Sequence, residues 1–316
     1  MLNFQGKNVN TITKIDVDDF FNSVLDEYQL KKKAFYNMCG LLKQMLEYCV
    51  DAEYIDKNPY RVKINKKKLI GSGKKASCKE VYQSNEIRLF MSEMERRLKN
   101  NPSNTAPLAA MLDFELGTRK GEILALSKSD IEGRRIHIHK QLIKDYDVSD
   151  VNSIKKLGFK IVEYTKTEDG DRWLPLSDRA IELIDRVMAI NKEYGLVCGD
   201  LLFVQDNHYL TPDTVDGQIR RACEYINIPV KTMHKIRKTY ASILLHNGVN
   251  LSIVKDLLGH ADESTTLRHY IYNIEETSIA EMQVLNALES KNGSSSDQSD
   301  QNNIINFPTK KIAKTP

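Results

Sequence analysis

Residues 233–270 read MHKIRKTYASILLHNGVNLSIVKDLLGHADESTTLRHY, and this stretch decides how the rest of the chain is interpreted. His234 and Arg237 are three residues apart in a run with helical apolar spacing, so they project from neighbouring positions on one helix face. Gly248 is expected to end that helix. The pattern therefore places an imidazole beside a guanidinium.

A second helix is predicted over residues 251–258, directly after this break. Gly259 permits a turn at its end and delivers His260. Tyr270 follows ten residues later, after a pair of threonines. Each of these residues alone is more typical of a core or a solvated surface. Their ordered combination indicates a site for an anion such as a phosphate.

Two further basic side chains have distinctive settings upstream. Arg119 lies in the sequence GTRKGE of residues 117–122, which opens an apolar helix, and Lys166 lies in the sequence TKT. Strands are predicted over residues 159–165 and 172–176, with an Asp-Gly turn between them. These strands are expected to pair as a hairpin with Lys166 near its tip.

The order and spacing of these four motifs resemble the tyrosine recombinases, also called the phage integrase family. The resemblance implies a mainly α-helical protein with a small antiparallel β-sheet. It implies an N-terminal helical core-binding domain and a C-terminal catalytic domain of the DNA breaking-rejoining type. The implied activity is site-specific recombination through a 3′-phosphotyrosyl intermediate. The protein would be the integrase of a phage or an integrative conjugative element, active in integration and excision without ATP, cofactor or metal.

The resemblance also gives each motif residue a chemical role. Arg119 and Arg237 would hold the phosphate, because a guanidinium offers two parallel donors and stays charged. His234 would accept the proton of the nucleophilic phenol, and His260 would donate a hydrogen bond to a phosphate oxygen. The remaining roles fall to Tyr270 as nucleophile, Lys166 as general acid and Glu122 as a residue that orients its neighbours.

Two positions complicate this assignment. Tyr272 is a second candidate nucleophile, but the interval from His260 and the preceding threonines favour Tyr270. Lys238 stands where many relatives have a histidine after the arginine, and it affects no assigned role.

The apolar pattern divides the chain into four parts. Helices over residues 16–25 and 33–50 suggest a small helical domain, and a polar, low-complexity sequence ends the chain. The expected parts are a core-type DNA-binding domain at 1–65, a basic linker at 66–81, a catalytic domain at 82–289 and a disordered tail at 290–316.

Basic residues are concentrated between the two predicted domains, although the formal net charge is only +3. Residues 57–79 contain nine basic residues and no acidic one, as expected for a strap along a phosphate backbone or for an ordinary solvated linker. The predicted DNA contacts are Lys63, Lys66, Lys67, Lys68, Lys74, Lys75, Arg220 and Arg221.

Other features exclude several classes of protein. The five cysteines are scattered, which indicates reduced thiols and not a disulfide framework. No apolar run has the length of a membrane span, so we expect no membrane partner and a cytoplasmic location. The sequence HIH at 137–139 lacks a nearby third metal ligand and is interpreted as two histidines on an exposed strand face.

Two other functions share parts of the pattern. A type IB topoisomerase would use the same residues as a monomer, and a non-catalytic DNA-binding regulator would not need the full set. For a recombinase the partners are double-stranded DNA at attachment sites and three further protomers of a synaptic homotetramer. An apolar helix face at Ile279, Met282, Leu285 and Leu288 would exchange between protomers, and accessory DNA-bending or excision factors are compatible with it. The chain begins too close to the first helices to hold an arm-binding domain, which indicates a simple recombinase or a truncated chain.

Overall fold

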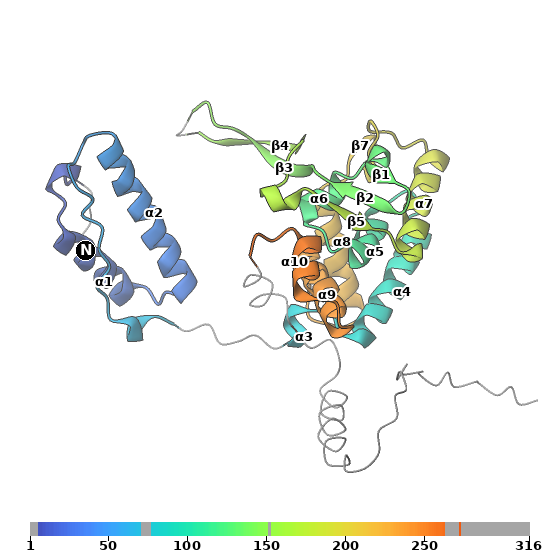
Figure 1. The fold of residues 1–316 in the computed structure, drawn as a ribbon, viewed down its shortest axis with the longest axis horizontal. Helices are drawn as coiled ribbons and strands as arrows, with labels where there is room; N and C mark the ends of the chain where they lie inside the picture. The colour runs from blue at the N-terminus through green and yellow to red at the C-terminus, as the bar shows by residue number, and fades with distance from the viewer. Residues whose placement is uncertain (1–5, 71–76, 151–152, 263–271, 273–316) are drawn as a thin grey trace, which may run out of the picture. The chain divides into compact units, whose positions relative to one another are not determined.

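The computed structural model describes residues 6–70, 77–150, 153–262 and 272. They form two compact units that divide between residues 75 and 76 (Figure 1). Each unit buries its own hydrophobic core. None of the helices in the described ranges combines the length and the apolar character that crossing a membrane requires.

The first unit is built on two helices, α1 (Lys14–Glu27) and α2 (Lys32–Asp51), which follow the short helix η1 (Val9–Thr11). Thr13 and Asp16 form a capping box at the start of α1, so the amides of these two residues have side-chain acceptors. The rings of Phe21 and Phe35 meet with their centroids 5.5 Å apart and centre the core. Both helices were predicted, and each extends slightly beyond its expected range.

Residues 66–70, assigned to the linker from the sequence, pack within this first unit. The lysines form the short helix η2 (Lys66–Lys68), and Leu69 after them is buried in the core. The amide of Ile70 donates to the carbonyl of Leu30 over 3.0 Å. The three lysines of η2 therefore belong to the first unit.

The second unit is mainly helical. Its helices in chain order are α3 (Ser77–Glu80), α4 (Ser84–Asn100), α5 (Ala106–Leu116), α6 (Lys120–Leu124), α7 (Asp178–Glu193), α8 (Pro212–Tyr225), α9 (Met233–His246) and α10 (Leu251–Leu258). Short helices η3 (Lys128–Asp130) and η4 (Glu168–Gly170) lie in its connections. Gln83 caps α4, because its side chain and that of Glu86 form a capping box.

Helix α5 is the centre of this unit. Its sequence APLAAMLDFEL is apolar on all sides, as expected for a helix with no solvent face, and every residue except Glu115 is buried. It packs against α4, α7, α8 and α9. The end of α5 and the start of α9 are consequently held in one rigid core.

The strands pair differently from the sequence-based expectation. Strands β1 (Ile131–Glu132), β2 (Arg135–Ile138) and β5 (Arg172–Pro175) form one antiparallel sheet, while β3 (Gln141–Asp147) pairs with β4 (Lys155–Val162). A third sheet is the small pair β6 (Val204–Gln205) and β7 (His208–Tyr209).

The predicted hairpin of residues 159–165 with 172–176 was therefore wrong. Strand β4 pairs with the alternating segment at 141–147, because that segment is its immediate neighbour in the chain. Strand β5 pairs with β2. Figure 1 shows the β3–β4 hairpin projecting from the helical body of the second unit. Lys166 consequently lies in the connection between β4 and β5, which also contains η4, and not at a hairpin tip.

Candidate active site

The turn after α5 positions Arg119. Gly117 ends the helix in the left-handed conformation with φ +59°, and a Cβ there would lie 2.1 Å from the ring of Tyr240. Oδ1 of the buried Asp113 side chain accepts hydrogen bonds from the Thr118 amide at 2.8 Å and from the Thr118 hydroxyl at 2.7 Å. The backbone around Arg119 is thus fixed from both sides.

The turn after α10 positions His260 in a similar way. Gly259 has φ +63°, and a Cβ there would lie 2.7 Å from the carbonyl oxygen of Asp169. Only glycine permits both this backbone conformation and this close approach. The predicted role of Gly259 as a helix-ending turn is therefore confirmed, and the approach places the Lys166-containing connection against it.

Glu122 is the electrostatic centre of the site. Its side chain is fully buried, and it accepts from Arg119 Nη1 at 2.7 Å and from Arg172 Nη2 at 2.9 Å. Arg237 Nη1 lies 4.0 Å from its Oε2. Burial raises the pKa of Glu122, but the charges of Arg172, Arg237 and Arg119 outweigh burial, so the pKa falls below its usual value. One negative charge thus faces three positive ones, which leaves net positive charge to attract an anion.

Arg237 joins the ends of three elements. Arg237 is 1% exposed. Its Nη1 donates to the carbonyl of Gly117 at 3.0 Å, and its Nη2 donates to the carbonyl of Leu258. Nη2 also lies 3.0 Å from Nε2 of His260. A lysine could not make these forked contacts.

His260 is a neutral imidazole in this arrangement. Since a guanidinium can only donate, Nε2 of His260 accepts from Arg237, and the ring proton belongs on Nδ1. Burial, followed by the charges of Arg237, Arg119 and Arg172, lowers the pKa of His260 to about 3. The ring therefore keeps one proton to donate throughout the physiological range.

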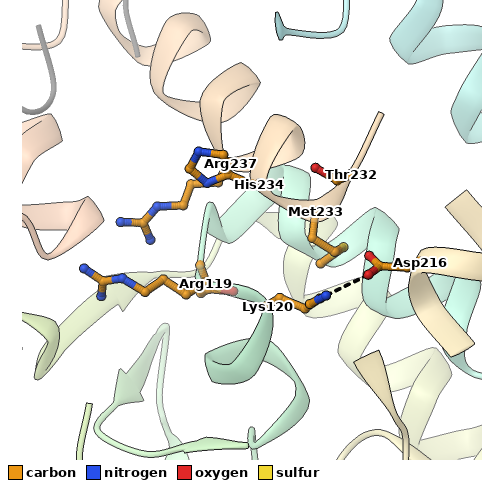
Figure 2. A pocket seen from close by; sticks show the side chains of 8 residues that line it. Arg119, Lys120, Asp216, Thr232, Met233, His234 and Arg237 are labelled. Carbon is orange, nitrogen blue, oxygen red and sulfur yellow. Dashed lines mark hydrogen bonds and ion pairs between the residues drawn. The ribbon is translucent and has the colours of Figure 1, made fainter. Parts of the chain in front are cut away.

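A pocket of about 280 Å³ opens beside these groups. Figure 2 shows the side chains of Arg119 and Arg237 extending in the same direction, with His234 next to Arg237. The pocket is also lined by Lys120, whose ammonium pairs with Asp216 over 2.7 Å. An open pocket with two guanidinium groups at its wall can receive a phosphodiester from solvent.

The structure thus brings together most of the predicted site residues. Arg119, Glu122, Arg237 and His260 form one connected group, and His234 lines the same pocket. Lys166 is solvent-exposed, in the connection that packs against Gly259. Tyr270 lies outside the described residues.

The predicted DNA contacts are distributed over both units. In the first unit Lys63 and the η2 lysines are exposed, and Lys68 pairs with Asp26. Arg220 and Arg221 are exposed on α8 in the second unit. Lys74 and Lys75 lie outside the described residues.

Arg172 was not among the predicted site residues. Its guanidinium donates to the carbonyls of Leu257 at 2.6 Å and Gly170 at 2.7 Å besides Glu122. It thereby ties the Lys166-containing connection to the end of α10. The alternation of β5 offered a signal, because Arg172 falls on the same buried face as Leu174.

His137 on β2 and His139 just after it each contact an aspartate side chain. His137 Nε2 lies 2.7 Å from Asp171, and His139 Nε2 lies 3.0 Å from Asp130. Their rings stack, and the ring of His137 also stacks on Trp173. Within the described ranges, no group of three or more His, Cys, Asp or Glu side chains is placed to hold a metal ion.

Comparison with known proteins identifies the class to which this fold and site belong. The model of the phage integrase family matches residues 80–276, which is more than half of the chain. The chain therefore belongs to the phage integrase family, the tyrosine-type site-specific DNA recombinases.

Among relatives, a XerC-like tyrosine recombinase of Caldanaerobacter subterraneus subsp. tengcongensis is 26% identical over 90% of this chain and 73% of its own length. The probable integrase of prophage ps2 of Lactococcus lactis is 30% identical over 78% of this chain and 64% of its own. The present chain thus spans only part of these relatives.

A solved structure has the same fold. The Tn1549 transposon integrase, in complex with a circular intermediate DNA, matches with a TM-score of 0.64 and 20% identity over 87% of this chain and 86% of that one. The predicted fold class, mainly α-helical with small antiparallel sheets, is confirmed.

Proposed function

We propose that this recombinase cleaves and rejoins DNA through a 3′-phosphotyrosyl intermediate formed by Tyr270. The observation that carries the proposal is the buried Glu122 carboxylate, which faces the guanidinium groups of Arg119, Arg172 and Arg237. Two of these arginines, Arg119 and Arg237, line the pocket. Negative charge grows on the non-bridging phosphate oxygens during attack, and fixed cations stabilise it without reorganising. This arrangement suits a phosphodiester better than a neutral substrate.

Arg119 and Arg237 take the role of phosphate clamp in this proposal. Arg237 is held by main-chain carbonyls, and Arg119 by Glu122 and by the carbonyl of Gly259 at 2.7 Å. Both are thereby preorganised before DNA arrives. Arg172 acts through Glu122 and the neighbouring backbone, so it is a positioning residue.

Proton transfers complete the reaction. The phenol oxygen of Tyr270 forms a bond to phosphorus, and its proton passes to His234 at the pocket. The bond to the 5′ oxygen breaks, and Lys166 protonates that oxygen as it leaves. The reverse steps with a different 5′ hydroxyl rejoin the strands. The energy of the phosphodiester is retained in the phosphotyrosyl ester, so ATP is unnecessary.

The substrate we infer is double-stranded DNA at attachment sites of a mobile element. Support comes from the prophage integrase among the relatives and from the structural likeness to a transposon integrase solved with circular intermediate DNA. Lys63, the η2 lysines, Lys74, Lys75, Arg220 and Arg221 would contact phosphates, because basic side chains provide most of the sequence-independent affinity. We place this activity in the bacterial cytoplasm, where such DNA lies.

The synaptic assembly in this proposal is a homotetramer. The apolar face of residues 279–288, which lies outside the described residues, would dock on a neighbouring protomer. Deletion of residues 279–289 should impair synapsis of two sites more than binding to one site. Native gels with one labelled site and an excess of a longer unlabelled site measure both. Equal recombination by the shortened protein would remove this role.

A nicked suicide substrate tests the covalent step. The short strand released on cleavage diffuses away, so the adduct accumulates and survives a denaturing gel. We expect the adduct with the wild type and with Tyr272→Phe, and none with Tyr270→Phe, while all three bind DNA. An adduct that persists in Tyr270→Phe and disappears in Tyr272→Phe would move the nucleophile to Tyr272.

A further inference from the structure

The first residues of the second unit, from α3 to the start of α4, are hydrogen-bonded to α9 and to the residues just before it. Lys238 Nζ on α9 donates to Glu80 Oε2 of α3 over 2.5 Å, and the amide of Tyr82 donates to Thr239 Oγ1 over 2.8 Å. Lys231, just before α9, pairs with Glu86 at the start of α4. Most of these groups are buried, so the entry segment and α9 are expected to move together.

Lys238 also contacts the chain near the proposed nucleophile. Its Nζ lies 3.4 Å from the hydroxyl of Tyr272 and 5.1 Å from the centroid of that ring. Lys238 directly follows Arg237 in the sequence, and Tyr272 is two residues beyond Tyr270. The Lys238 side chain thereby connects α3, α9 and Tyr272.

Lys238 is held in this position by the interactions of its positive charge. Burial lowers its pKa, but the hydrogen bond to Glu80 and the contacts with Tyr272 outweigh burial, so the pKa is raised above its ordinary value. A buried ammonium needs a counter-charge, which Glu80 supplies, and an electron-rich ring face is a second favourable neighbour. The ammonium is therefore bound on one side by a carboxylate and on the other by a phenol.

We propose that Lys238 is a positioning residue that places Tyr270 for attack by holding Tyr272. The proposal rests on the proposed function, since it concerns the same covalent step. It also gives Tyr272 a part that differs from that of a nucleophile. Glu80 is the anchor on which the position of Lys238 depends.

The experiment measures single-turnover adduct formation with saturating DNA on the nicked suicide substrate. Lys238→Met removes the charge but keeps the length, and Lys238→Arg retains the charge. Lys99→Met on the exposed surface of α4 is the matched control. We expect Lys238→Met to slow adduct formation by about tenfold to a hundredfold, as a misplaced nucleophile would. DNA affinity should not change, and Lys238→Arg should recover most of the rate.

A second substrate separates placement of the nucleophile from help to the leaving group. A sulfur atom in place of the bridging 5′ oxygen leaves as a thiolate and needs no general acid. It should rescue Lys166→Ala but not Lys238→Met. Rescue of Lys238→Met by the sulfur substrate would overturn the proposal, and so would a wild-type rate for Lys238→Met on the ordinary substrate.

A third variant covers the possibility that Lys238→Met does not fold. Tyr272→Leu removes the ring and hydroxyl but leaves the Lys238–Glu80 pair in place. We expect it to slow adduct formation by about fivefold or more without a change in DNA affinity. An unchanged rate would overturn the positioning role. Failure of the wild type to form any adduct would instead contradict the proposed function itself.

Discussion

Arg237 donates a hydrogen bond from Nη2 to Nε2 of His260 over 3.0 Å, and so the two side chains set each other's state. The arginine keeps the imidazole neutral and fixes its proton on Nδ1, while the imidazole helps to orient the guanidinium. Residues 23 positions apart in the chain thereby form one hydrogen-bonding unit at the pocket. Several measurable properties depend on this relationship and on the turns that create it.

His260 should remain neutral where an ordinary histidine becomes charged. Its pKa is lowered to about 3, so the ring shifts in an assigned NMR titration should stay constant between about pH 5 and 8. In urea the same signal should titrate near ~6.5. Below pH ~6.5 the unfolded chain therefore binds a proton at His260 that the folded chain does not bind. This difference lowers the free energy of unfolding as the pH falls. A midpoint inside the pH 5–8 range in the folded protein would contradict the assigned contact.

Arg237→Lys should impair cleavage although it preserves the charge. A lysine cannot reach Gly117, Leu258 and His260 together, so the phosphate clamp loses its fixed geometry. We expect adduct formation to fall by about 10²–10³-fold with little loss of DNA affinity. Arg88→Lys on the exposed surface of α4 is the matched control. Equal rates for the two variants would show that only charge matters at Arg237.

Gly117→Ala should disturb both folding and activity. The backbone has φ +59°, and the added Cβ would lie 2.1 Å from the Tyr240 ring, whereas Gly133 has φ +57° with open space around it. Gly133→Ala therefore reports the cost of the conformation alone, about 1 kcal/mol in urea unfolding. Gly117→Ala should cost clearly more, on the order of 3 kcal/mol, and should slow cleavage. An equal loss of unfolding free energy in the two variants would show that the Tyr240 ring can move away from the added Cβ without a measurable penalty.

Asp113 should make stability depend on pH. Burial raises its pKa to about 7, above the value of an unfolded aspartate, so the folded state binds more protons between about pH 4 and 7. This group therefore destabilises the protein as the pH rises through that range, by about 2–4 kcal/mol. Asp113→Asn stays neutral and still offers an oxygen to Thr118.

The measurement for Asp113 is the free energy of unfolding of wild type and variant at several pH values. The free energy of unfolding of Asp113→Asn should rise relative to that of the wild type between pH 5 and pH 8. Asp185→Asn, at an exposed position of α7, controls for the loss of one carboxylate. A constant difference between Asp113→Asn and the wild type would contradict a folded-state pKa of about 7 for Asp113.

Local sequence patterns were sufficient to predict helices α9 and α10 and the glycine turn that precedes His260. Helix α9 has apolar spacing that places His234 and Arg237, and Gly259 ends α10 with a positive φ. Such signals are local, because they depend on neighbours within one or two turns. The left-handed turn at Gly117 was not predicted.

Long-range partners could not be predicted in the same way. The pairing of β5 with β2, 34 residues apart at the Ile138 and Arg172 register, depends on which strands compete for an edge. The contact of Lys238 with Glu80 spans 158 residues and involves an exception to the usual family pattern. The resemblance supplied the catalytic set, but it gave no indication of what holds that set in place.

The central claim is that Arg119 and Arg237 act on the charge of the scissile phosphate. A suicide substrate with a methylphosphonate at that linkage removes one negative oxygen and with it the need for the clamp. We predict that Arg237→Ala and Arg119→Ala form little adduct on the ordinary substrate but approach the wild-type rate on the methylphosphonate. The account would be contradicted if both variants were as impaired on the neutral linkage as on the charged one.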